Sequence, residues 1–168
     1  KHIKDYRFDE ASRNAYQFVW HSYCDWYVEL SKTILNSKNQ KDIKEVKIVS
    51  SYIFKQILIL MHPFIPFITE EIWLKNKLDN RKKNYLMLAN WPKDKSKKDE
   101  SYKEVKKIIN MISEIRSFKN ELNVNPGSFI DVSIEKVTNK SFFIKNDVIF
   151  KRLGRINNLF EKDQNKPG

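Results

Sequence analysis

The chain has 168 residues, of which 40% are hydrophobic and 13% aromatic, so it can bury a core and is not a disordered protein. Its 3 glycines are too few for a phosphate-cradling loop or a hairpin-rich β fold, and its single cysteine excludes an internal disulfide and a multi-cysteine metal site. The net charge of +11 favours a polyanionic partner such as nucleic acid, although a compositionally biased genome gives the same excess of lysine.

Two long helices are predicted at the start of the chain. Apolar residues spaced three and four positions apart predict one helix over 8–35 and a second over 41–61. The polar loop 36–40 that joins them is short, and short loops connect antiparallel neighbours. The chain is therefore expected to begin as a helical hairpin.

A stiff turn is predicted after the second helix, at Pro63 and Pro66. Neither proline donates a backbone hydrogen bond, and each disfavours helical angles in the residue before it. A third helix is expected over 68–78, opened by Thr69 or by the Pro66 region. The two glutamates that follow Thr69 suit the first turn of that helix, where the helix dipole favours negative charge.

A change of composition near the middle of the chain predicts a domain boundary. Residues 85–92 form a short apolar segment that ends at a proline and is expected to lie along the bundle as an extended strap. The charged stretch 93–100 contains no apolar residue and is interpreted as a linker. Two parts are therefore predicted, a helix bundle over 1–98 and a smaller appendage over 99–168.

The appendage is predicted to mix helix and strand. Helical spacing marks 101–121, and alternating β-branched residues mark a strand over 129–134. A short helix is expected over 142–153 and a second strand over 156–160. The predicted fold class is mainly α: an antiparallel helix bundle followed by a small α/β subdomain.

No catalytic constellation is found in the sequence. The three histidines, His2, His21 and His62, lack metal-ligand partners at the usual spacings, so no metal site is predicted. His62 precedes a proline at a helix end and is expected to have a capping or packing role. Cys24 lies among aromatic residues and is interpreted as a half-buried structural thiol. No catalytic residue is therefore predicted in this chain.

The first helix carries an unusual number of aromatic side chains. Phe18 and Trp26 lie on its central apolar stripe and are expected to be core. A second line of rings follows at roughly helical spacing: Tyr16, Trp20, Tyr23 and Tyr27. Exposed rings beside cations can stack unpaired bases, so this line is a candidate RNA-binding surface.

A second candidate surface is basic. Arg116, Lys119 and Asn120 share one face near the end of the predicted helix over 101–121. These side chains can hold phosphates, or they can satisfy the last carbonyls of the helix.

Five sequence blocks carry a family resemblance, and the first of them, at 6–11, reads Tyr-Arg-Phe-Asp-Glu-Ala. Residues 18–32 are centred on Cys-Asp-Trp-Tyr, His-Pro-Phe-Ile-Pro-Phe stands at 62–67, Leu-Ala-Asn-Trp-Pro stands at 88–92, and 115–124 reads Ile-Arg-Ser-Phe-Lys-Asn-Glu-Leu-Asn-Val. In this order the blocks resemble the anticodon-binding helix bundle of class I aminoacyl-tRNA synthetases, the valyl-tRNA synthetases above all. The resemblance covers the chain from about residue 6 to residue 160.

The resemblance implies a C-terminal piece of a longer ligase, which attaches valine to its tRNA with ATP and magnesium. This piece is expected to bind the anticodon stem-loop of valine tRNA and to be non-catalytic. It is expected to need no cofactor, because the family's His-x-Gly-His and Lys-Met-Ser-Lys-Ser type motifs are not in the sequence. The predicted tRNA-binding residues are Arg7, Trp20, Tyr23, Arg116 and Lys119.

The sequence also predicts a cytoplasmic location, since it has one cysteine, no apolar signal core at the start and no membrane-spanning apolar run. The protein is expected to be a monomer. Two alternatives stay open. A leucyl or isoleucyl relative would keep the proline block but should not carry Cys24-Asp25-Trp26-Tyr27. A purely structural helical interaction module would use its lysines only for solubility.

Overall fold

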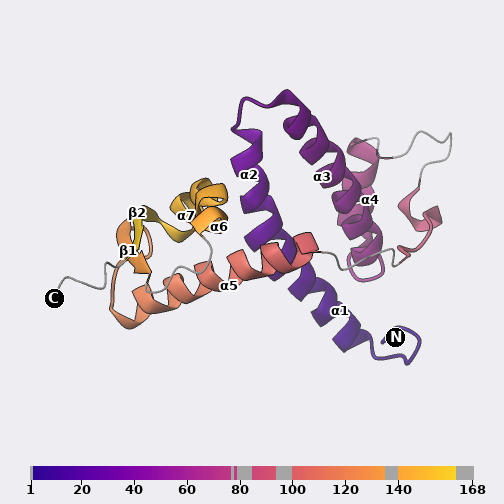
Figure 1. Cartoon of the computed structure of the whole chain (residues 1–168). Coiled ribbons are helices and arrows are strands. Elements are labelled where there is room, and N and C mark those ends of the chain that lie inside the picture. Colours follow the sequence, from indigo (N-terminus) through magenta and orange to yellow (C-terminus); the bar gives the residue numbers. More distant parts are fainter. Residues whose placement is uncertain (1, 77, 79–84, 94–99, 135–139, 162–168) are drawn as a thin grey trace. The chain divides into compact units, whose positions relative to one another are not determined.

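The computed structural model describes residues 2–76, 78, 85–93, 100–134 and 140–161 (Figure 1). The chain divides into two compact units, Lys1–Ser96 and Lys97–Gly168. Most of the charged linker expected over 93–100 lies outside the described residues, so its structure stays a prediction. Among the helices that the structure describes, none has the length and apolar character needed to cross a membrane.

The first long helix is continuous but not uniform. It is built from α1 (Phe8–Gln17), the π-helical segment η1 (Phe18–Val28) and α2 (Glu29–Leu35), and the helix predicted over 8–35 is therefore confirmed. The π-helical stretch was not predicted. Its i→i+5 hydrogen bonds are rare in proteins and often mark functional sites.

The second long helix, α3 (Gln40–Met61), runs back along the first, as Figure 1 shows. Asn39 begins it, because its side-chain oxygen accepts hydrogen bonds from the backbone N–H groups of Lys41 and Asp42. The Tyr27 hydroxyl lies 3.2 Å from Ser50 Oγ and ties η1 to α3. The predicted helical hairpin is therefore confirmed.

The third helix, α4 (Pro66–Lys75), begins at Pro66, whose fixed φ and missing N–H suit a first helical turn. Thr69 does not open the helix; its hydroxyl donates back to the carbonyls of Ile65 and Pro66, at 2.9 and 3.0 Å. The first turn contains no acidic residue. The prediction that the two glutamates after Thr69 occupy it is therefore wrong, since they lie one turn later.

The core of the N-terminal unit joins α3, α4 and the segment that was predicted as a strap. That segment forms one 3₁₀ turn, η2 (Leu86–Leu88), between two residues with extended backbone angles. Leu86 is 2% exposed and packs with three other buried side chains: Leu58, Ile59 and Trp73. The expected packing along the bundle is confirmed, and burial of these side chains stabilises it. The prediction that the segment is extended throughout is wrong, because Leu86–Leu88 form a helical turn.

The C-terminal unit combines helices with two strands. Its elements are α5 (Glu100–Glu121), β1 (Ile130–Ile134), α6 (Lys140–Lys145), α7 (Asp147–Gly154) and β2 (Ile156–Glu161). The strands pair in parallel, with Ile130 opposite Ile156 and an irregularity before Val132. The mainly α fold with a small α/β part is confirmed, although the one helix predicted over 142–153 is divided at Asn146.

The corner between α7 and β2 is tight. Arg155 has a positive φ of 54° and ends α7 in the left-handed region. A Cβ atom on Gly154 would lie 3.1 Å from Ile156 Cδ1, closer than ordinary van der Waals contact. A larger residue at position 154 would therefore require the Ile156 side chain to shift by a few tenths of an ångström. Lys119 of α5 donates hydrogen bonds to the carbonyl groups of Gly154 and Arg155 at this corner.

Candidate nucleic-acid interface

Two exposed rings stack on one another where α1 meets η1. The ring centroids of Tyr16 and Trp20 are 6.3 Å apart and their planes differ by 5°. The two residues are 55% and 53% exposed. The i, i+4 spacing across this junction places both rings on one side of the helix. Trp20 is therefore accessible, as a base-stacking residue has to be.

Tyr23 and Tyr27 form a second stacked pair, with centroids 5.5 Å apart and planes differing by 16°. Both are half-buried, and the contact between Tyr27 and Ser50 directs this pair toward α3. Burial raises the pKa of Tyr23 above its ordinary value, and the neighbouring Tyr27 and Cys24 raise it further. The ring of Tyr23 is therefore less accessible to an RNA base than the ring of Trp20.

The central stripe of the first helix is less buried than predicted. Phe18 was expected to be core, but it is 45% exposed, and Phe8 is 53% exposed. Trp26 is half-buried, and Ala15 is the residue of α1 that the structure buries. The prediction for Phe18 is wrong because spacing identifies an apolar face but does not supply a neighbour to cover it. Cys24 is half-buried, as expected.

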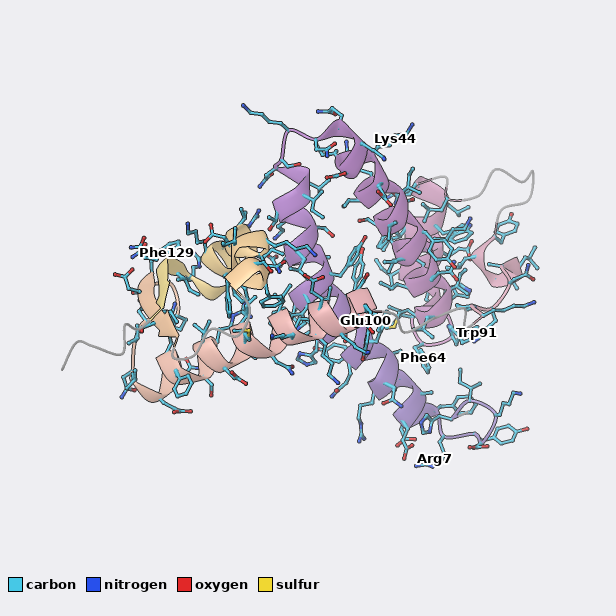
Figure 2. All side chains as sticks on the ribbon, in the orientation of Figure 1. Arg7, Lys44, Phe64, Trp91, Glu100 and Phe129 are labelled. Carbon is cyan, nitrogen blue, oxygen red and sulfur yellow. The ribbon has the colours of Figure 1, made fainter. Side chains whose placement is uncertain are left out.

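Arg7 lies at the N-terminal end of α1 (Figure 2) and forms an ion pair with Glu10. Its guanidinium is partly exposed but already has a carboxylate partner. Arg13 is exposed three residues before Tyr16, on the side of the helix that carries the ring pair. The structure therefore favours Arg13 over Arg7 as a cation beside the stacked rings.

Lys119 is buried, with 3% of its surface exposed. Its ammonium donates to the carbonyls of Ser128, Gly154 and Arg155, at 2.8, 3.2 and 3.3 Å. Burial lowers its pKa, and the positive charges of Arg155 and Arg116 lower it further. All three ammonium protons have acceptors inside the unit. The predicted phosphate contact for Lys119 is therefore corrected to a structural role.

Arg116 also contacts the backbone of the C-terminal unit, donating to the carbonyl of Leu153 at 3.0 Å. With Lys119 and Arg155 it lines a pocket of about 330 Å³. Arg155 lies over the ring of Phe129, 5.5 Å from its centroid. The sequence left two roles open for this group, binding phosphates or satisfying the last carbonyls of its own helix. The contacts of Lys119 and Arg116 are with carbonyls outside α5, at Ser128 and at Leu153–Arg155, so they match neither role.

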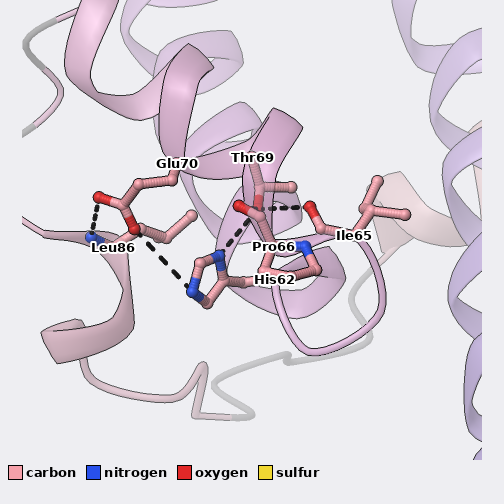
Figure 3. Close-up of polar contacts among 6 residues, drawn as sticks. All are labelled: His62, Ile65, Pro66, Thr69, Glu70 and Leu86. Carbon is pink, nitrogen blue, oxygen red and sulfur yellow. Dashed lines mark hydrogen bonds and ion pairs between the residues drawn. The ribbon is translucent and has the colours of Figure 1, made fainter.

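The proline turn holds a small polar cluster, drawn in Figure 3. His62 Nδ1 lies 2.8 Å from Thr69 Oγ1, and His62 Nε2 lies 3.9 Å from Glu70 Oε2. The other oxygen of Glu70 accepts from the N–H of Leu86 at 2.9 Å. The cluster joins the end of α3 to α4 and η2, so the packing role expected for His62 is confirmed.

The described residues contain no group of three or more His, Cys, Asp or Glu side chains that could hold a metal ion. Residues 1–134 match the family model of the anticodon-binding domain of tRNA ligase. The chain belongs to this family. The match covers the N-terminal unit and then α5 and β1 of the C-terminal unit. The resemblance read from the five sequence blocks is therefore confirmed.

Valine–tRNA ligases are similar to this anticodon-binding domain along nearly its whole length. The relative from Pelagibacter ubique strain HTCC1062 is 65% identical over 99% of this chain, which spans 19% of that ligase. The relative from Rhizobium meliloti strain 1021 is 35% identical over 94% of the chain and 17% of the ligase. The relative from Zymomonas mobilis is 36% identical over 96% of the chain and 19% of the ligase. The chain therefore spans about a fifth of the length of these relatives.

Proposed function

We propose that this anticodon-binding domain binds the anticodon stem-loop of valine tRNA, through the side of α1 and η1 that carries Tyr16 and Trp20. Loops of RNA hold unstacked bases, and proteins read such bases by stacking rings on them and by bonding their edges. The stacked, half-exposed pair of rings is the observation that carries this proposal. The net charge of +11 supports it, because lysines and arginines attract phosphates.

The longer protein is proposed to be a valine–tRNA ligase, which joins valine to its tRNA with ATP and magnesium. The names of the relatives support this activity, and their greater length leaves room for a catalytic part elsewhere. This chain contributes binding and orientation of the tRNA. A monomeric state and a cytoplasmic location stay predictions.

The test is the affinity of the full 168-residue chain for a valine tRNA transcript and for the same transcript with its anticodon bases replaced. We expect the altered transcript to bind more weakly, because the stacked and bonded bases change while the phosphates do not. Fluorescence anisotropy at one moderate salt concentration gives both dissociation constants. Equal affinity for the two transcripts would overturn anticodon recognition.

The variant Trp20→Ala tests whether the Tyr16–Trp20 ring pair is the surface that binds the RNA. Trp20→Ala removes a ring whose stacking contributes about 1–3 kcal/mol per base, so affinity for the unaltered transcript should fall by about 5- to 140-fold. Phe67→Ala is the matched control, because Phe67 is 90% exposed and lies on α4. Equal losses in the two variants would show that the ring pair is not the binding surface.

A further inference from the structure

A second concave surface lies in the N-terminal unit, between α3 and the residues that follow η2. One wall comes from residues of α3 at i, i+3, i+4 and i+7, which share one face of the helix: Tyr52, Lys55, Gln56 and Ile59. The other wall is the segment 89–93. The pocket encloses about 720 Å³, within the range of about 300–1,000 Å³ that is usual for small-ligand sites.

The pocket has a buried apolar base and two rings nearer the solvent. Trp73 is fully buried and, with Ile59, forms part of the packed core beneath it. Tyr52 is 56% exposed and Trp91, labelled in Figure 2, is 47% exposed. Tyr52 comes from α3 and Trp91 from the opposite wall. A flat aromatic ligand therefore has a ring to stack on from either wall.

The polar groups of the pocket are amides and cations. Gln56 and Asn90 each carry an amide, which both donates and accepts hydrogen bonds. Lys55 Nζ donates to the carbonyl of Leu78 at 2.8 Å and lies 5.2 Å from the centroid of the Trp73 ring. Lys93 is exposed at the end of the other wall. The described residues that line the pocket include these two lysines and no carboxylate, so the pocket favours an anion.

We propose that this pocket binds one nucleotide unit. The base stacks on Tyr52 and faces Trp91 on the opposite wall, the amides of Gln56 and Asn90 bond its edge, and Lys93 attracts its phosphate. An inorganic anion would use the lysines alone, whereas a nucleotide uses the rings, the amides and the charge together. The site is separate from the Tyr16–Trp20 pair, so it goes beyond the anticodon contact proposed above.

Photochemical cross-linking tests the proposal on the full chain. The probes are a single-stranded RNA hexamer that contains 4-thiouridine, and 4-thiouridine monophosphate, each irradiated with the chain and mapped by mass spectrometry. We expect the hexamer to cross-link at Tyr52, Trp91 or their immediate neighbours. Cross-linking by both probes would mean that a free nucleotide suffices, and cross-linking by the hexamer alone would assign the site to an RNA chain. Cross-links only outside the pocket, or none with either probe, would overturn the proposal.

A matched pair of tyrosines supplies the affinity test with the same hexamer. Tyr52→Ala should weaken binding by about 5- to 140-fold, and Tyr52→Phe should retain it, because the stacking ring remains. Tyr85→Ala is the control, since Tyr85 is 52% exposed and does not line the pocket. Its effect should stay below about twofold. No loss with Tyr52→Ala, or equal losses with Tyr52→Ala and Tyr85→Ala, would overturn the proposal.

The Trp20→Ala variant separates the two binding proposals. Loss of hexamer binding with Tyr52→Ala but not with Trp20→Ala supports the pocket, and the transcript comparison then decides the anticodon contact independently. Loss with Trp20→Ala but not with Tyr52→Ala overturns the pocket and leaves the ring pair as the RNA surface.

Discussion

At the scale of single residues, Lys119 shows what a buried cation needs. An ammonium group taken out of water is unfavourable unless acceptors replace the water. Here three carbonyls do so, one just before β1 and two at the corner between α7 and β2. One side chain of α5 therefore fixes the approach to both strands, which explains why the residue is inside rather than on an RNA-facing surface.

Lys119→Met tests this role. The variant keeps an unbranched apolar stem but leaves the carbonyls of Ser128, Gly154 and Arg155 without their shared donor. We expect the free energy of unfolding to fall by about 2–4 kcal/mol, since losing a buried charged donor costs more than losing a neutral one. Urea unfolding followed by circular dichroism measures it. Lys103→Met, at an exposed lysine paired with Glu100, should change stability by less than about 0.5 kcal/mol.

Glu104 gives a prediction for pH. Its hydrogen bonds with Lys145 and then Asn146 hold the pKa of its carboxyl below the ordinary value. A folded-state pKa below the unfolded one means that the unfolded chain binds more protons in acid. The stability from this group is therefore present above the ordinary glutamate pKa of about 4.3 and is lost as pH falls through the lowered pKa.

The measurement is the urea midpoint of the wild-type chain and of Glu104→Gln from neutral pH into acid. We expect the wild type to be more stable near neutral pH and the difference to shrink below about pH 4. Glu114→Gln alters an exposed carboxyl of the same helix and serves as the control. A difference between wild type and Glu104→Gln that grows as pH falls would contradict the assigned pairing.

At the scale of elements, the turn from α3 into α4 depends on polar contacts as well as on proline. Thr69 is 2% exposed, and its one hydroxyl proton is donated to the carbonyls behind it. The oxygen therefore accepts from His62, so Nδ1 of the imidazole carries a proton. The turn at the two prolines has no side-chain N-cap for α4 among the described residues. Side-chain hydrogen bonds of Thr69 and His62 instead hold the two helix ends together.

Thr69→Val keeps the shape of the side chain and removes its hydroxyl. We expect it to lower the free energy of unfolding by about 1–3 kcal/mol, because the half-buried imidazole N–H loses its acceptor. Thr33→Val is the matched control, since Thr33 Oγ1 is buried and has no hydrogen-bond partner within the described part of the chain. That variant should be neutral or slightly stabilising. Equal destabilisation in both variants would show that the hydrogen bonds of the Thr69 hydroxyl add nothing to the free energy of unfolding.

At the scale of the whole molecule, the net charge of +11 should make the affinity for RNA depend on the salt concentration. Cations that neutralise RNA phosphates release bound counterions, so affinity falls as salt rises. Between about 50 and 200 mM salt, each phosphate contact should weaken binding of valine tRNA by about 3.5-fold. Fluorescence anisotropy of a labelled transcript across a salt series measures the slope. An affinity that stays constant would mean that the excess of lysine does not contact the RNA.

The sequence by itself determined the helices, the strands and the family, because these depend on residues that are close along the chain. Periodic apolar positions define both long helices, prolines interrupt the chain at 63 and 66, and β-branched alternation marks β1. The stacking of Tyr16 on Trp20 could also be predicted from the sequence, since i, i+4 spacing alone brings two rings together.

Only the tertiary structure decided which of these side chains are accessible. The ammonium of the buried Lys119 donates to carbonyls that lie 35 and 36 positions away in the sequence. Tyr52 and Trp91 line one pocket although 39 positions separate them. Phe18 stays exposed on a face whose spacing resembles a core. Burial is set by which distant segment returns to cover a face, and that pairing leaves no local pattern in the sequence.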